Sequence, residues 1–204
     1  MGVYADFIHP KLCDVVMRNR RFVPYRERIA GAAYGHVLEI GISSGINLPF
    51  YHAEVCSVAG IEPSMRLIAM ARRSALASPV PAAFIQGSAE LIPLDDDSID
   101  TIVTTFTLCS IQNAPAALAE MRRVLKPEGR LLFLEHGLAP DRGVRRWQVL
   151  LAPAWKRAAG GCELNRPIDK LIETAGFKFD RLETGYMPGP KPVTFLYEGS
   201  AKPN

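Results

Sequence analysis

The chain has 204 residues, of which 48% are hydrophobic and 22% are charged, and its formal net charge is +3. This composition is that of an ordinary globular protein, and the length suits a single domain over 1–204 with a substantial core. The charge is too small to indicate nucleic-acid binding. No apolar run reaches the roughly 18 residues of a transmembrane helix, and the N-terminus lacks the apolar stretch of a signal peptide. We expect a cytoplasmic protein.

The spacing of the cysteines speaks against a zinc site and against a disulfide framework. They lie far apart and form no C-x-x-C pair: Cys13, Cys56, Cys109 and Cys162. Widely spaced cysteines of this kind fit a protein of the reducing cytoplasm, and we expect no bound metal ion.

Strand and helix patterns alternate along the chain after an N-terminal helical region. Residues 4–30 predict two helices, because Pro10 and Pro24 interrupt the pattern. The predicted strands that follow are 37–41, 55–61, 82–86, 99–105 and 130–135. Several are apolar almost throughout, as a sheet covered on both faces requires. The predicted helices between and after them are 64–77, 114–125 and 166–175, opened by Ser64, Asn113 and Asn165.

Two more strands, 177–184 and 193–198, close the chain, and the segment between them has no helical periodicity. This connection predicts an antiparallel pair. The sequence therefore predicts an α/β fold with a doubly wound, mostly parallel seven-stranded sheet and an antiparallel last strand.

The turn that follows the first predicted strand indicates the ligand class. Residues 37–40 run directly into a turn of small residues that contains Gly41 and Gly45, so a ligand can lie against the backbone there. The nicotinamide-dinucleotide pattern G-x-G-x-x-G would need glycine at 43 and a small residue at 46, but Ser43 and Ile46 stand there. S-adenosylmethionine (SAM), which has no phosphate, needs those glycines less. A dehydrogenase is the weaker alternative.

The other strand ends supply further candidate site residues. Glu62 follows the second strand, 23 residues after Glu39, where a carboxylate can accept hydrogen bonds from both ribose hydroxyls. The alternative is a solvated acid at the start of a helix. His136 ends the fifth strand, where it either faces the reacting group or is only a polar residue at a strand exit. Cys109 is more readily explained as a small core residue than as a nucleophile.

The ordered motifs LEIGISSG, GIEPS, GSAELIPLDDDSID and RVLKPEGRLLFLEH resemble those of the class I SAM-dependent methyltransferases, in particular the type 11 small-molecule group, over residues 36–136. The resemblance implies the Rossmann-like methyltransferase fold, with SAM as cofactor. It also implies the cofactor-binding residues, with two departures from the family pattern at Ser43 and Ser88: Glu39, Gly41, Ser43, Gly45, Glu62, Met65, Ser88, Ala89, Thr107 and Leu108.

The second half resembles a narrower subgroup whose animal members are alkyl-thiol methyltransferases. The shared features are the Glu135-His136 pair, the spacing of Trp147, Pro153 and Trp155, and the run GCELNR at 161–166. The resemblance implies methyl transfer to a small hydrophobic thiol. His136 would act on the acceptor proton, and Trp147, Trp155 and Cys109 would contact the acceptor.

Two segments are expected to border the site, a helical lid over 1–33 and a helical insert over 137–164. Both contain clusters of arginines, at 18–28 and 142–157, which are either solvated helix faces or peripheral contacts to a membrane. A lipid amine or a phenol/quinone-type acceptor is the alternative to a thiol. A SAM-binding module without turnover is a third hypothesis, supported only by Ser43 and Ser88.

Overall fold

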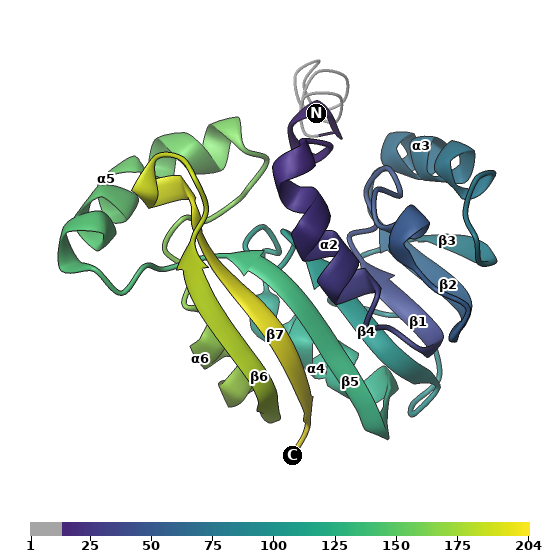
Figure 1. Ribbon diagram of the computed structural model, residues 1–204. Helices are drawn as coiled ribbons and strands as arrows, with labels where there is room; N and C mark the ends of the chain where they lie inside the picture. Colours follow the sequence, from purple (N-terminus) through teal and green to yellow (C-terminus); the bar gives the residue numbers. More distant parts are fainter. Residues whose placement is uncertain (1–13) are drawn as a thin grey trace.

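A computed structural model describes residues 14–204 of the chain (Figure 1). Its sheet comprises β1 (Gly35–Ile40), β2 (Val55–Glu62), β3 (Ala82–Gln86), β4 (Ile99–Thr105), β5 (Leu125–His136), β6 (Phe177–Tyr186) and β7 (Phe195–Pro203). The helices are α2 (Val23–Ala30), α3 (Met65–Ala75), α4 (Ala114–Val124), α5 (Arg142–Ala158) and α6 (Ile168–Thr174). Short 3-10 turns stand at η2 (Arg20–Phe22), η3 (Leu48–Phe50) and η4 (Lys191–Val193).

The strand order is β3-β2-β1-β4-β5-β7-β6. The strands β1 to β5 are parallel to one another, whereas β7 is antiparallel to both β5 and β6. The predicted fold class is confirmed, including the antiparallel last strand. The order reverses between β1 and β4, and in such a sheet ligands bind at the carboxyl ends of the strands beside that reversal.

Both faces of the sheet are covered, which explains the nearly continuous apolar strands. Leu38 and Ile40 of β1 belong to the core under α4 and α6, whereas Val37 belongs to the opposite core, under α2. Figure 1 shows α2 on one face of the sheet and α4 and α6 on the other. Successive residues of one strand therefore point into two different cores.

Most element boundaries agree with the sequence prediction to within two residues. Ser64 and Asn113 cap α3 and α4 through bonds to the amides of Leu67 and Ala116. The predicted start of β5 at residue 130 is wrong, because β5 begins at Leu125. Leu125 pairs with Ile99 and Arg130 with Thr101, so residues 126–129 form a bulge inside the strand rather than a turn before it.

The predicted lid over 1–33 stays a prediction, and its residues 1–13, with Pro10, lie outside the described residues. Pro24 does mark a boundary, since it stands in the first turn of α2. The insert over 137–164 contains α5, which lies beyond the ends of β6 and β7, beside their connection (Figure 1). Within residues 14–204, no helix is long and apolar enough to cross a membrane.

Candidate active site

A cavity of about 890 Å³ opens at the carboxyl ends of the parallel strands, beside the reversal of strand order. Its lining comes from the segments after β1 to β5, from residues 16–26, from the end of α5 and from the connection between β6 and β7. It includes most of the site residues predicted from the sequence: Glu39, Gly41, Ser43, Glu62, Ser88, Ala89, Thr107, Cys109, His136 and Trp155.

Glu39 lies at the floor of the cavity and is almost fully buried. One carboxylate oxygen accepts a hydrogen bond from Asn47 Nδ2 at 2.8 Å, and the other accepts one from the Tyr51 hydroxyl at 2.7 Å. Asn47 in turn accepts a bond from the buried guanidinium of Arg26 on α2. Burial raises the pKa of Glu39 to about 7, and the bonds from Tyr51 and Asn47 limit that rise.

Glu62 is held at the end of β2 by two backbone amides. Its carboxylate accepts hydrogen bonds from the N–H of Ser43 at 3.2 Å and of Ser64 at 3.0 Å. Burial nevertheless raises the pKa of Glu62. Ser43 adopts a φ of 53°, in the left-handed region that favours glycine, and the bond to Glu62 stabilises that conformation.

Gly41 brings the β1 turn into contact with the segment after β4. Its φ is +67°, and a Cβ atom there would lie 2.5 Å from Thr107 Oγ1, so only glycine fits this approach without displacement. At the end of β3, Ser88 donates a hydrogen bond to Glu90, which also accepts one from the backbone amide of Asn113.

The loop after β4 is organised by the buried carboxylate of Glu135. It accepts bonds from the Thr104 hydroxyl at 2.8 Å and from the backbone amides of Thr107 at 3.0 Å and Cys109 at 3.4 Å. Burial raises the pKa of Glu135 to about 7. The neighbouring residues Glu135 and His136 therefore have different positions: Glu135 binds the loop after β4, and His136 lines the cavity.

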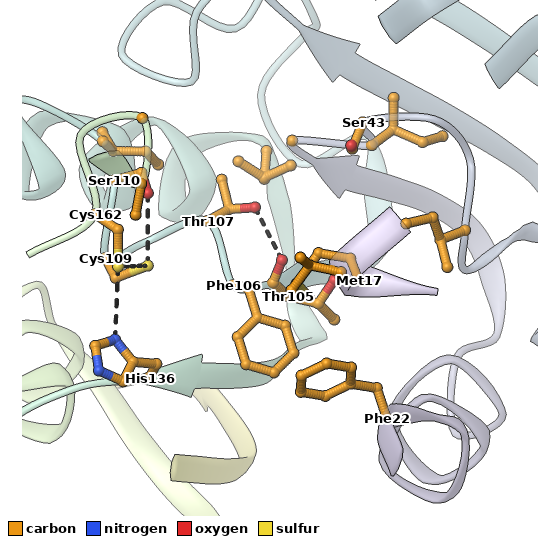
Figure 2. A pocket seen from close by; sticks show the side chains of 18 of the residues that line it. Met17, Phe22, Ser43, Thr105, Phe106, Thr107, Cys109, Ser110, His136 and Cys162 are labelled. Atoms are coloured by element: carbon orange, nitrogen blue, oxygen red, sulfur yellow. Dashed lines mark hydrogen bonds between the residues drawn. The ribbon is translucent and has the colours of Figure 1, made fainter. Parts of the chain in front are cut away.

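Cys109, His136 and Cys162 converge at one side of the cavity (Figure 2). The two sulfur atoms are 3.4 Å apart, and Cys162 Sγ lies 3.6 Å from His136 Nδ1. The hydrogen bond between the two thiols lowers the pKa of Cys162. The same bond, together with burial, raises the pKa of Cys109. The sequence placed these residues 27 and 26 positions apart, so their spacing could not reveal the cluster.

Four predicted site residues do not line the cavity. Met65 is 52% exposed in the first turn of α3, and Trp147 is 57% exposed on α5. Leu108 is directed into the core instead, because the backbone turns between Thr107 and Cys109. Gly45 packs against Ala71 in α3, so it positions the β1 turn without reaching the ligand space.

Other residues at the site were not predicted. Arg26 and Asn47 line the cavity through contacts that only the folded chain creates. Arg166 donates bonds to the carbonyl oxygens of Leu108 at 2.5 Å and Ile111 at 2.7 Å, so it clamps the 162–166 segment to the loop after β4. The run GCELNR was the available signal, but it did not show what Arg166 binds.

A family profile described as a methyltransferase domain matches residues 38–133. Thiol S-methyltransferase TMT1B of Rattus norvegicus is 34% identical over 158 residues, which cover 76% of this chain and 64% of that protein. Thiol S-methyltransferase TMT1A of Homo sapiens is 34% identical over 155 residues, which cover 72% of this chain and 62% of that protein. The chain belongs to the class I SAM-dependent methyltransferases. It spans just under two thirds of the length of these two relatives.

The solved structure of a SAM-dependent methyltransferase of Thermotoga maritima, described as a possible histamine N-methyltransferase, has the same fold. Its TM-score is 0.68 at 21% identity, and the match covers 99% of this chain and 98% of that one. SAM is the cofactor that the family implies for this methyltransferase. The buried acids at the ends of β1 and β2 and the close approach at Gly41 suit a ligand that carries a ribose and an amino-acid group.

Proposed function

We propose that this methyltransferase transfers the methyl group of SAM to a small hydrophobic thiol. The observation that carries the proposal is the shape of the cavity: one space joins the buried acids of β1 and β2 to a sulfur- and imidazole-lined end at His136. The relatives named as thiol S-methyltransferases support the choice of acceptor.

The cofactor half would be formed by the turn after β1 and by Glu62. Glu62 would accept hydrogen bonds from both ribose hydroxyls, while Ser88 and Ala89 would meet the adenine. Glu39, Gly41 and Thr107 would line the methionine end, where the carboxylate of Glu39 attracts the cationic ammonium and sulfonium groups. SAM supplies an activated methyl group, so the protein has to position it and exclude water.

The acceptor half would be formed by His136, Trp155 and the cysteine pair. The Nε2 atom of His136 has no hydrogen-bond partner in the described part of the chain, although it is buried. An imidazole there can take the proton of an acceptor thiol, and the thiolate is the nucleophile. Its sulfur would bond to the methyl carbon of SAM while the bond from that carbon to the sulfonium sulfur breaks.

Mass spectrometry of the products tests this proposal. The purified protein is incubated with SAM and a series of alkyl thiols, and separately with phenols and with amine lipids in vesicles. We expect methyl thioethers to form in preference to the other products. Preferential methylation of a phenol or an amine lipid would overturn the thiol assignment, and SAM binding without turnover on any acceptor would favour a module without activity.

His136→Gln separates the acceptor half from the cofactor half. We expect kcat to fall about 100-fold or more, the usual contribution of a positioned acid or base, while the SAM dissociation constant stays unchanged. An unchanged kcat would leave His136 with a packing role only.

We also propose that α5 rests on an anionic membrane surface. Its exposed face presents Trp147, Val149, Leu150 and Leu151 together with Arg142, Arg145, Arg146, Lys156 and Arg157. An interfacial helix has this combination of apolar and basic side chains. Hydrophobic acceptors partition into lipid, and Trp155, in the last turn of the same helix, lines the cavity.

A further inference from the structure

We propose that Cys109, Cys162 and His136 form a zinc site whose fourth position is open to the cavity and binds the acceptor thiol. The inference rests on the proposed function, and it assigns to a bound cation the deprotonation that the imidazole would otherwise perform alone. The spacing of the cysteines argued against a zinc site, but the folded chain brings two of them together with a histidine.

The distances fit a tetrahedral ion. The ligand atoms of the three residues all lie within 4.8 Å of one another, with 3.4 Å between the sulfurs and 3.6 Å between Cys162 Sγ and His136 Nδ1. A tetrahedral zinc with Zn–S bonds of about 2.3 Å and Zn–N bonds of about 2.05 Å places two sulfurs about 3.8 Å apart and a sulfur and a nitrogen about 3.6 Å apart. The third pair, Cys109 Sγ and His136, lies within 4.8 Å and has to approach to about 3.6 Å when the ion binds.

The chemistry of the donors favours zinc. Two thiolates and one imidazole are soft or intermediate ligands, which select Zn²⁺ over Mg²⁺ or Ca²⁺. Within residues 14–204, no further histidine, cysteine or carboxylate side chain joins these three residues as a fourth ligand. Structural zinc sites have four protein ligands, whereas catalytic sites have three and keep one position open. All three residues line the cavity, so the open position faces the ligand space.

The site is held in shape by contacts outside the three ligands. The Cys109 amide donates to Glu135, and its carbonyl oxygen accepts a bond from the Glu163 amide at 2.8 Å. Arg166 binds the carbonyl oxygens on either side, at Leu108 and Ile111. These bonds tie the two cysteine-bearing loops together, and such supporting contacts orient the ligands of a metal.

The reaction balances without any further reagent. An alkyl thiol in the fourth position loses its proton to solvent and binds the zinc as a thiolate, because a coordinating thiol is deprotonated. Its sulfur bonds to the methyl carbon of SAM, and the bond between that carbon and the SAM sulfur breaks. The electron pair remains on the sulfur of S-adenosylhomocysteine, and the neutral thioether, a weak ligand, leaves the metal.

Metal titration of reduced, chelator-treated protein tests the site. Zn²⁺ is titrated in competition with a chromophoric chelator, and Co²⁺ is added separately to record the sulfur-to-cobalt charge-transfer and tetrahedral d–d bands. We expect one ion per chain, with affinity reduced about 100-fold or more in Cys109→Ser and in Cys162→Ser. Cys56→Ser is the matched control, since Cys56 is exposed and outside the cluster. Equal Zn²⁺ affinity in all four proteins would overturn the proposal.

A measurement on the unaltered chain covers the case in which a variant fails to fold. Zn²⁺ should slow the alkylation of Cys162 at least about tenfold and leave the alkylation of Cys56 unchanged, as mapped by peptide mass spectrometry. Equal rates for Cys162 with and without Zn²⁺ would contradict the site.

Turnover of stripped and zinc-restored protein separates this inference from the proposed function. We expect stripping to lower the rate of thiol methylation about 100-fold without changing the SAM dissociation constant. Full thiol methylation by stripped protein would overturn the zinc role and leave the proposed function standing. Zinc bound at the cluster with no thiol methylated in either form would overturn the proposed function and the role of zinc in it, while supporting the metal site.

Discussion

The buried carboxylate of Glu62 accepts hydrogen bonds from two backbone amides. The position of this carboxylate therefore depends on the turn after β1 and on the start of α3. Ser43 in that turn adopts a left-handed φ although it is not glycine. The hydrogen bond from its backbone N–H to Glu62 explains how this departure from the family pattern is accommodated. The sequence singled out Glu62 as a candidate ribose-binding residue because strand ends can be recognised from chain order, and the folded chain places it in the cavity lining. It could not predict Arg26 or Asn47, since their contacts join distant segments.

Glu62→Gln tests the proposed ribose contact. The variant keeps one acceptor oxygen for the backbone amides but loses the charge and the second acceptor, so we expect the SAM dissociation constant to rise roughly 10- to 100-fold, the equivalent of about 1.5–3 kcal/mol for a bond to a charged group. Isothermal titration measures it, with Glu54→Gln, an exposed acid before β2, as the control. Equal affinities of the two variants would contradict the ribose assignment.

Glu39 predicts a pH dependence of stability. Its pKa is about 7 in the folded chain against 4.5 for the ordinary group, so between these values the folded state holds a proton that the unfolded state has lost. The free energy of unfolding therefore falls as pH rises through this window and levels off above about pH 7. At pH 8 the ionised, buried carboxylate costs on the order of 3 kcal/mol at most.

Glu39→Gln removes this dependence and keeps an acceptor oxygen for one of the two donors, Asn47 Nδ2 and the Tyr51 hydroxyl. We expect the difference in unfolding free energy between variant and parent to move in favour of the variant from about pH 5 to about pH 8. Denaturant titrations without SAM measure that difference. Because other buried acids titrate equally in both proteins, a difference that is constant with pH would show that Glu39 ionises normally.

At the scale of elements, the turn between β1 and η3 and the loop after β4 form one structural unit. Gly41 contacts Thr107, and Glu135 of β5 holds the amides of Thr107 and Cys109. The strand ends were predictable from apolar runs and glycines, whereas the bulge at 126–129 was not, because Pro127 and Gly129 give the same local pattern in a turn and in a bulge. The register with β4 decides between the two.

Gly41→Ala should disrupt this unit. The new Cβ would stand in a left-handed conformation and 2.5 Å from Thr107 Oγ1, so we expect a loss of about 1–3 kcal/mol in unfolding free energy and weaker SAM binding. Thermal melts and SAM titration measure the two effects. Gly185→Ala is the control, because nothing lies within 4 Å of its Cβ position. Equal melting temperatures of the two variants would contradict the close approach.

At the scale of the whole molecule, chain order predicted the doubly wound sheet because βα units leave few alternatives, and the fold places most predicted site residues in one cavity. The cysteine–histidine cluster escaped prediction because its members come from distant parts of the chain: the loop after β4, the last residue of β5 and the segment after α5. The orientation of α5 could not be predicted from the sequence either. Trp147 and Trp155 stand eight positions apart on one helix, yet only Trp155 reaches the cavity, since Trp147 lies with Val149, Leu150 and Leu151 on the exposed side of the helix.

That outward face predicts binding to anionic vesicles. The basic side chains of α5 would each contribute about 1 kcal/mol near a negatively charged surface, and this attraction falls with added salt. Leu150 is 68% exposed, so Leu150→Glu should leave the fold intact and weaken vesicle binding about tenfold or more by removing an inserted side chain. Leu76→Glu is the control, since Leu76 is 89% exposed after α3 and away from α5. Co-sedimentation with vesicles of anionic and of zwitterionic lipid measures the binding. If the two variants bind equally, α5 is a solvated helix and the acceptor reaches the cavity from water. If zwitterionic vesicles bind as well as anionic ones, the basic side chains of α5 do not attract the protein to the membrane.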